Sequence, residues 1–186
     1  MRFICLMGRS QSGKSSVENK LEQLGFKRSI SYTTREPQIR KGKLEENGVD
    51  YIFVSREEFL NLVDKGYIIE YEEYNNNLYG TPRPFGSTRY VAVVCIGGFR
   101  ALKKLYGNQV VGVHLKIDTE TAEKRGEARD GSTELTINRK NEDDKLTKQM
   151  EDEADIVIDS SKDLNIIVSD ILKHVRGLEE SSNENV

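Results

Sequence analysis

The sequence predicts an α/β fold of three layers, in which helices cover both faces of a parallel five-stranded sheet. Apolar runs suited to buried strands alternate along the chain with stretches of helical periodicity, and this order is typical of a parallel sheet. The pattern G-x-x-x-x-G-K-[ST], typical of a phosphate-binding loop, lies between the first such run and the first helical stretch. Two segments, 31–81 and 120–147, are expected to leave this core beyond the carboxyl ends of the strands, where ligands collect.

The composition limits the class of protein. The 186 residues fit one compact domain with small inserted lobes, and 36% hydrophobic with 32% charged residues is typical of a soluble globular protein. No run approaches the length of a membrane span and the N-terminus has no signal-peptide pattern, so we expect a cytoplasmic protein without a membrane partner. A net charge of −3 argues against bulk nucleic-acid binding. Both cysteines lie in strand-like runs and are expected to be buried free thiols.

The phosphate-binding loop follows the apolar run 3–7. Gly8 and Gly13 allow the backbone to approach a ligand closely, and the N–H groups at a helix N-terminus bind phosphate. Lys14 can reach the outer phosphates, and the Ser15 hydroxyl is a ligand for Mg²⁺. A glycine-rich helix entry with an exposed lysine is the alternative. The residues predicted to bind the phosphates of a nucleotide, which the resemblance described below implies is ATP, are Gly8, Ser10, Ser12, Gly13, Lys14, Ser15 and Ser16.

Residues 31–81 are predicted to form a small, largely β lobe inserted after the first strand, loop and helix. Strands are predicted at 27–34, 49–54, 67–71 and 77–80, the last two around an Asn-rich turn. Ser55 and Glu58 form a capping box that opens a helix. The basic segment 35–43 is either a solvated loop or a second anion-binding surface.

Five apolar runs predict the strands of the core sheet, at 3–7, 28–30, 90–96, 110–117 and 155–158. The run 90–96 is apolar throughout, as expected of a central parallel strand covered on both faces. The segment 120–147 is too polar for a core helix, and is either a solvated excursion or a mobile lid that brings arginines over a phosphate. The last helix is expected to end at Gly177, followed by a disordered tail at 178–186.

Several motifs, taken in chain order, resemble the guanylate kinase family of the nucleoside monophosphate kinase group. Besides the phosphate-binding loop they are Ser31-Tyr32-Thr33-Thr34-Arg35-Glu36-Pro37, Gly48-Val49-Asp50-Tyr51-Ile52-Phe53-Val54-Ser55, Ile69-Glu70-Tyr71 and Asn77-Leu78-Tyr79-Gly80-Thr81. They follow one another in the order of the family between residues 8 and 81, and together they are more specific than the loop alone.

The resemblance implies a P-loop kinase core, a lobe that binds a nucleoside monophosphate, and a lid. The core would comprise 1–30, 82–119 and 148–177, with 31–81 as the lobe and 120–147 as the lid. It also implies Mg²⁺-assisted transfer of the γ-phosphoryl group of ATP to GMP or dGMP, by a monomer or homodimer. Small-molecule nucleotides would be its partners.

The resemblance also assigns roles to single residues. Ser31, Glu70 and Thr81 would bind the acceptor base, Arg35, Tyr51 and Tyr79 its phosphate, and Lys14, Arg35, Arg125, Arg129 and Arg139 would act in phosphoryl transfer. Guanine presents N1–H and the 2-amino group as adjacent donors, and one carboxylate, Glu70, can accept both. Positioning and electrostatics suffice for this chemistry, so no general base is predicted.

The sequence departs from the family pattern at three places. Gln38 stands where the family usually has a second arginine, and Val93-Val94-Cys95 lacks the usual Asp-x-Asp. The segment after Thr81 is short and contains two prolines. These departures leave two alternatives open. One is the same chemistry on another acceptor, such as another nucleoside monophosphate or ribose 1,5-bisphosphate. The other is a non-catalytic binding module, although such modules typically lose the loop that is intact here.

Overall fold

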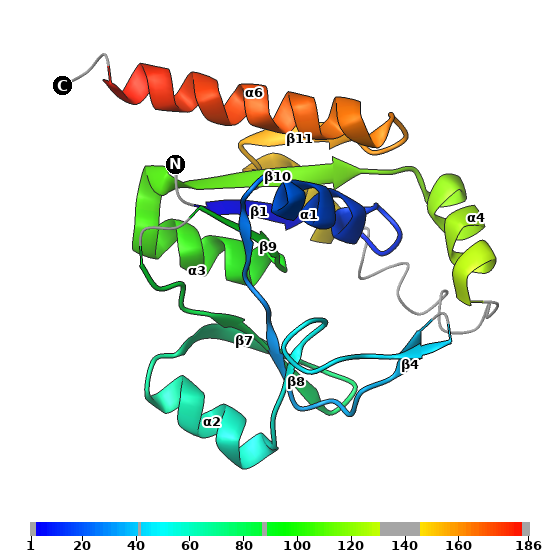
Figure 1. Ribbon diagram of the computed structural model, residues 1–186, viewed down its shortest axis with the longest axis vertical. Coiled ribbons are helices and arrows are strands. Elements are labelled where there is room, and N and C mark those ends of the chain that lie inside the picture. Colours follow the sequence, from blue (N-terminus) through cyan, green and yellow to red (C-terminus); the bar gives the residue numbers. More distant parts are fainter. Residues whose placement is uncertain (1–2, 41, 87–88, 131–145, 184–186) are drawn as a thin grey trace.

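A five-stranded parallel sheet forms the centre of the molecule in the computed structural model, which describes residues 3–40, 42–86, 89–130 and 146–183 (Figure 1). In spatial order its strands are β11 (Ile156–Asp159), β10 (Val110–Lys116), β1 (Phe3–Met7), β9 (Tyr90–Val93) and β2 (Lys27–Arg28). Each pair of neighbouring strands in this sheet is parallel. The predicted fold class is therefore confirmed.

Helices cover both faces of this sheet. One face carries α1 (Lys14–Gln23) and α6 (Leu164–Asn183), and the other carries α3 (Ile96–Tyr106) with helical residues 146–153. Successive side chains of a strand point to opposite faces. Ile4 and Leu6 of β1 therefore pack toward α1 and α6, while Phe3, Cys5 and Met7 pack toward α3. All five are buried, which explains why this run is apolar without alternation.

The inserted segment forms a second sheet beside the core (Figure 1). Its strands, in spatial order, are β6 (Ile52–Phe53), β3 (Tyr32–Thr33), β8 (Asn77–Pro82) and β7 (Ile68–Tyr74), while β4 (Ile39–Arg40) and β5 (Lys43–Leu44) form a separate hairpin. The helix α2 (Arg56–Asp64) begins after Ser55, whose Oγ accepts a hydrogen bond from N of Glu58 at 3.1 Å. Asn75 and Asn76 join β7 to β8 with φ angles of 49° and 59°, as in a type I′ turn.

The strand predicted at 90–96 ends too late, because β9 stops at Val93 and α3 begins at Ile96. Cys95 is the N-cap of α3, and its Sγ accepts a hydrogen bond from N of Gly98 at 3.3 Å. Periodicity alone does not separate a short buried strand from the start of a buried helix. Here the packing of Ile96 and Phe99 in the apolar cluster beneath α3 decides the boundary.

Two strands predicted for the inserted segment are also corrected. The strand predicted at 27–34 is two strands, β2 and β3, because the chain crosses from the core sheet to the second sheet between them. The strand predicted at 49–54 is reduced to β6, because N of Val49 and N of Asp50 both donate to O of Glu46 in a turn, at 3.1 and 3.0 Å. Of the remaining core strands, β1 has the predicted bounds, β10 ends one residue earlier than predicted, and β11 both begins and ends one residue later.

The C-terminal helix is longer than predicted. It continues through Gly177 to Asn183 as part of α6, so residues 178–183 are not a disordered tail. Leu178 packs against the apolar cluster between α6 and the sheet, which offsets the helix penalty of about 1 kcal/mol for Gly177. Residues 184–186 of the expected tail lie outside the described residues.

The helix α4 (Thr119–Asp130) begins the predicted lid. Asp118 caps it, since Oδ1 of Asp118 accepts a hydrogen bond from N of Thr121 at 2.8 Å. Residues 131–145 of the predicted lid, which include Arg139, lie outside the described residues. Within the described ranges, every helix is too short or too polar to cross a membrane.

Close packing of β10 against α3 gives a test of this fold. A methyl group at Gly112 would lie 2.6 Å from Cε2 of Phe99 and 3.2 Å from Cε of Met7. We expect Gly112→Ala to lower the free energy of unfolding by about 1–3 kcal/mol, because the sheet and α3 must move apart. Gly177→Ala is the matched control, since a methyl group there meets no atom within 4 Å. It should raise the free energy of unfolding by roughly 0.5–1 kcal/mol.

Urea unfolding followed by circular dichroism measures both effects. Equal changes in the two variants would contradict this account of the packing.

Candidate functional site

The loop between β1 and α1 has a conformation suited to phosphate binding. Gly8 and Gly13 have positive φ angles of 143° and 83°, where residues with a Cβ are strained. A methyl group at Gly8 would also lie 2.6 Å from O of Leu115, so the loop lies directly against the end of β10. Gly13 is the N-cap of α1. The loop therefore ends at the N-terminus of α1, and a helix N-terminus is a favourable site for an anion.

Lys14 lies over this loop. Its Nζ donates hydrogen bonds to O of Gly8 at 2.6 Å and O of Arg9 at 2.8 Å. Ser10, Ser15 and Ser16 are exposed, whereas Ser12 is buried beneath the loop. The predicted loop residues are thus brought together around one helix N-terminus.

One predicted lid arginine lies close to the loop. NH1 of Arg125 donates to O of Gln11 at 3.4 Å, and NH2 donates to O of Ser160 at 3.2 Å. Arg125 thereby joins α4 to the loop and to the segment after β11. Arg129 lies one turn further along α4, and Arg139 lies outside the described residues.

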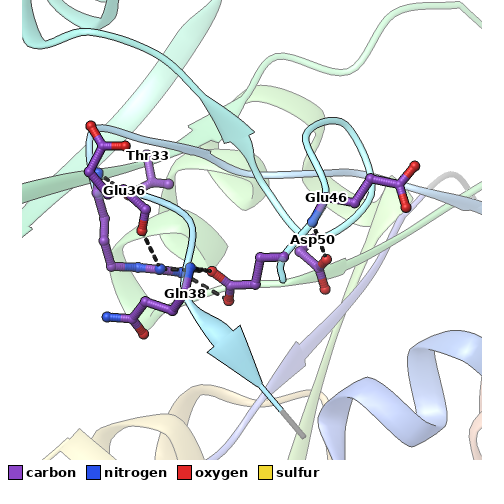
Figure 2. Close-up of polar contacts among 7 residues, drawn as sticks. Thr33, Glu36, Gln38, Glu46 and Asp50 are labelled. Atoms are coloured by element: carbon purple, nitrogen blue, oxygen red, sulfur yellow. Dashed lines mark hydrogen bonds and ion pairs between the residues drawn. The ribbon is translucent and has the colours of Figure 1, made fainter. Parts of the chain in front are cut away.

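Arg35 is buried in an ion pair with Glu45. Its NH1 and NH2 donate to the two carboxylate oxygens of Glu45 at 2.7 and 3.1 Å, and NH1 also donates to O of Glu36 at 2.8 Å. Figure 2 shows Glu36 and Gln38 around this pair, and N of Gln38 donates to Glu45 at 2.9 Å. Burial lowers the pKa of Arg35, but the hydrogen bonds and charge of Glu45 raise it above its ordinary value. The basic segment 35–43 is therefore not simply a solvated loop.

Two predicted tyrosines lie beside Arg35. Cζ of Arg35 is 5.3 Å from the ring centre of Tyr51, and the rings of Tyr51 and Tyr79 meet edge to face with centres 6.1 Å apart. Tyr51 precedes β6 and Tyr79 lies on β8, on either side of β3. Three residues predicted to bind an acceptor phosphate therefore form one cluster.

Glu70 and Thr81 form a second cluster on the neighbouring strands β7 and β8. They are paired in register, and Oγ1 of Thr81 donates to Oε2 of Glu70 at 3.3 Å. Burial first, and then the charge of Glu72, raise the pKa of Glu70 above its ordinary value. Ser31 lies just before β3, and within the described part of the chain its side chain forms no hydrogen bond with Glu70.

Two residues of the site carry no clear signal in the sequence. Glu45 is one of several acidic residues in a charged stretch, and only burial distinguishes it. Cys95 belongs to an apolar run, yet its Sγ lies 3.8 Å from both carboxylate oxygens of Glu70. Among the described residues, no group of three or more His, Cys, Asp or Glu could hold a metal ion.

The fold and the loop together define the class of protein. A parallel sheet with this loop between its first strand and first helix is a P-loop nucleotide-binding fold. The sequence model of the family described as Guanylate kinase matches residues 1–177. The chain belongs to the guanylate kinase family.

Individual relatives agree with this assignment. The chain is 44% identical to the guanylate kinase of Mesoplasma florum over 87 residues, and this stretch covers 45% of this chain and 28% of that protein. It is 46% identical over 85 residues to that of Rubrobacter xylanophilus, 44% of this chain and 41% of that protein. The crystal structure of guanylate kinase from Anaplasma phagocytophilum is similar over 95% of this chain and 85% of that one, with a TM-score of 0.67 and 26% identity. The chain thus matches less than half the length of these two curated relatives.

Breaking the buried ion pair of Arg35 and Glu45 should have a measurable cost in stability. Glu45→Ala leaves the Arg35 charge buried without its carboxylate, so we expect the free energy of unfolding to fall by about 3–5 kcal/mol. Glu73→Ala is the control, because it breaks the pair with Arg56, whose side chains are 48% and 53% exposed. Water already screens that pair, so the free energy of unfolding should change much less in the control. Urea unfolding of both variants measures the difference, and a Glu45→Ala variant as stable as the control would disprove the role of the pair.

Proposed function

We propose that this chain transfers the γ-phosphoryl group of ATP to GMP or dGMP, giving ADP and GDP or dGDP. The observation that carries the proposal is the combination of an intact phosphate-binding loop with a half-buried carboxylate, Glu70, on the inserted sheet. Membership of the guanylate kinase family supports it. The boundaries of the lobe (31–81) and the lid (120–147) belong to this proposal, as do a cytoplasmic location and a monomeric or homodimeric state.

On the donor side, the loop would bind the ATP phosphates. The N–H groups at the start of α1 would donate hydrogen bonds to phosphate oxygens. Nζ of Lys14, which lies at the carbonyls of Gly8 and Arg9, would contact the outer phosphates. Mg²⁺ needs only one or two protein oxygens besides phosphates and waters. The exposed hydroxyl of Ser15 in the first turn of α1 fits that need. The ion would neutralise charge on the phosphates during transfer.

On the acceptor side, Glu70 would select guanine. An ionised carboxylate accepts N1–H and the 2-amino group together, whereas adenine presents an acceptor at N1 that the carboxylate repels. Thr81 holds Glu70 through its hydroxyl, and Ser31 completes the base site in this proposal. The raised pKa of Glu70 means that acid protonates it sooner than an exposed glutamate, so guanine binding should weaken at low pH.

Arg35, Tyr51 and Tyr79 would hold the acceptor phosphate. A guanidinium has five N–H donors, and the hydrogen bonds to Glu45 and Glu36 use three of them. Two donors therefore remain for phosphate oxygens, while Glu45 fixes the plane of the group. The tyrosine hydroxyls would add further donors beside it.

In the transfer step, an oxygen of the acceptor phosphate attacks the γ-phosphorus in line with the departing ADP oxygen. Negative charge is spread over the transferring group, so cations placed around it lower the barrier. Lys14 and Arg125 both contact loop carbonyls and would supply such charge, together with Arg129 and Arg139. Arg35 would orient the attacking phosphate.

A panel of acceptors tests the guanine assignment. With ATP and Mg²⁺, we expect turnover with GMP or dGMP and not with AMP, CMP, UMP, dTMP or ribose 1,5-bisphosphate. Glu70→Ala should lower kcat/KM for GMP by about a thousandfold, since it removes two hydrogen bonds to a charged group. Glu73→Ala, which removes an exposed carboxylate of the same strand, is the control and should change kcat/KM little. Turnover restricted to another acceptor would refute the guanine assignment.

Lys14→Ala tests the donor side. We expect kcat to fall by roughly 10²–10³-fold, because a cation that stabilises the transferring group is lost. GMP binding, measured by calorimetry without ATP, should stay unchanged. Lys20→Ala, a lysine of the same helix outside the loop, is the matched control and should keep full kcat. A protein that binds neither ATP nor any acceptor would favour a non-catalytic binding module.

A further inference from the structure

The N-terminus of α3 lies directly behind the carboxylate of Glu70. Sγ of Cys95 is 3.8 Å from both carboxylate oxygens of Glu70 and accepts a hydrogen bond from N of Gly98 at 3.3 Å. The thiol therefore sits between the first turn of α3 and the side chain that would select the base. β9, which leads into this turn, belongs to the core sheet, whereas Glu70 belongs to the inserted sheet.

Two glycines make this close contact possible. A methyl group at Gly97 would lie 2.7 Å from Oε1 of Glu70, and one at Gly98 would lie 2.5 Å from Oγ1 of Thr81. Neither distance is compatible with ordinary van der Waals contact. The backbone of α3 thus closes the inner side of the Glu70 carboxylate, and the Cys95 thiol is the side chain of α3 that reaches it.

The thiol acts as a hydrogen-bond donor in this position. Burial first, and then the negative charge of Glu70, raise the pKa of Cys95 to about 12. The sulfur therefore stays protonated at neutral pH and is not a nucleophile. Glu72 is the further charged group that acts on both Glu70 and Cys95, and it raises the pKa of each.

We infer that Cys95 is a positioning residue for the acceptor base, acting through Glu70. This role rests on the proposed function. An ionised carboxylate has about four lone-pair sites. The Cys95 thiol and the Thr81 hydroxyl occupy sites on the inner side, and the two remaining sites match the two adjacent donors of guanine. Cys95 thereby orients the carboxylate, and its hydrogen bond favours the ionised form of Glu70.

Thiol reactivity tests the contact without any nucleotide. Glu70→Gln removes the negative charge beside Cys95, so the pKa of the Cys95 thiol should fall. For each unit of that fall, the thiolate fraction at pH 8 rises by about tenfold, and the rate of alkylation by iodoacetamide should rise with it. Cys95→Ala is the background control, because it leaves only Cys5, which is fully buried. Equal alkylation rates in Glu70→Gln and the unmodified protein would overturn the contact.

The pH dependence of GMP phosphorylation tests the positioning role. Without the thiol donor the pKa of Glu70 rises further, so in Cys95→Ala the acidic limb of kcat/KM for GMP should move to higher pH. KM for GMP at neutral pH should rise by about tenfold, as for the loss of one hydrogen bond to a charged group, with kcat little changed. Cys95→Ser keeps a donor that can also cap α3, and should restore both values.

A control separates positioning from helix capping. Ser55→Ala removes the side-chain cap of α2, in which N of Glu58 donates to Ser55 as N of Gly98 donates to Cys95. This variant should leave the acidic limb of kcat/KM for GMP unshifted. An unshifted limb in Cys95→Ala, in a protein that phosphorylates GMP, would overturn the positioning role alone. A protein that does not phosphorylate GMP at all would overturn the proposed function and this role with it.

Discussion

The arrangement of this molecule depends on one junction, where the first turn of α3 meets β7. The core sheet and the inserted sheet are separate, and at this point backbone without side chains, Gly97 and Gly98, lies against Glu70 and Thr81. Figure 1 shows α3 between the core sheet and β7. Because the contact is made by backbone, it fixes the distance between the two sheets closely. The proposed donor and acceptor sites are then held at a defined separation.

The proposed acceptor side is further stiffened by the ion pair of Arg35 and Glu45. Both side chains are buried, and the same carboxylate accepts the backbone N–H of Gln38. A buried pair costs desolvation, which two charge-assisted hydrogen bonds offset only in good geometry. Such a pair is better understood as fixing orientation than as adding stability. In the proposed function, the pair fixes the orientation of the Arg35 guanidinium, which would bind the acceptor phosphate.

The departures from the family pattern have physical consequences here. Gln38 does not supply a cation, but its backbone N–H holds Glu45 and so acts on Arg35. Cys95 brings a neutral donor to Glu70, where a carboxylate would add like charge. Both changes reduce the number of charged side chains around the proposed acceptor site. They therefore bear on affinity and pH dependence more than on the fold.

The sequence by itself determined the layers of the fold and the loop. Strand periodicity, buried apolar runs and the two loop glycines are local properties, and the structure confirms the parallel sheet and the positive φ angles at Gly8 and Gly13. Tertiary structure alone decided where β9 gives way to α3 and how far α6 continues. It also decided that Glu45 contacts Arg35 and that Cys95 contacts Glu70. These depend on burial and on contacts between residues distant in the chain. In a charged stretch, no local pattern distinguishes a buried glutamate such as Glu45 from an exposed one. In an apolar run such as 90–96, no local pattern separates the end of a strand from the start of a helix.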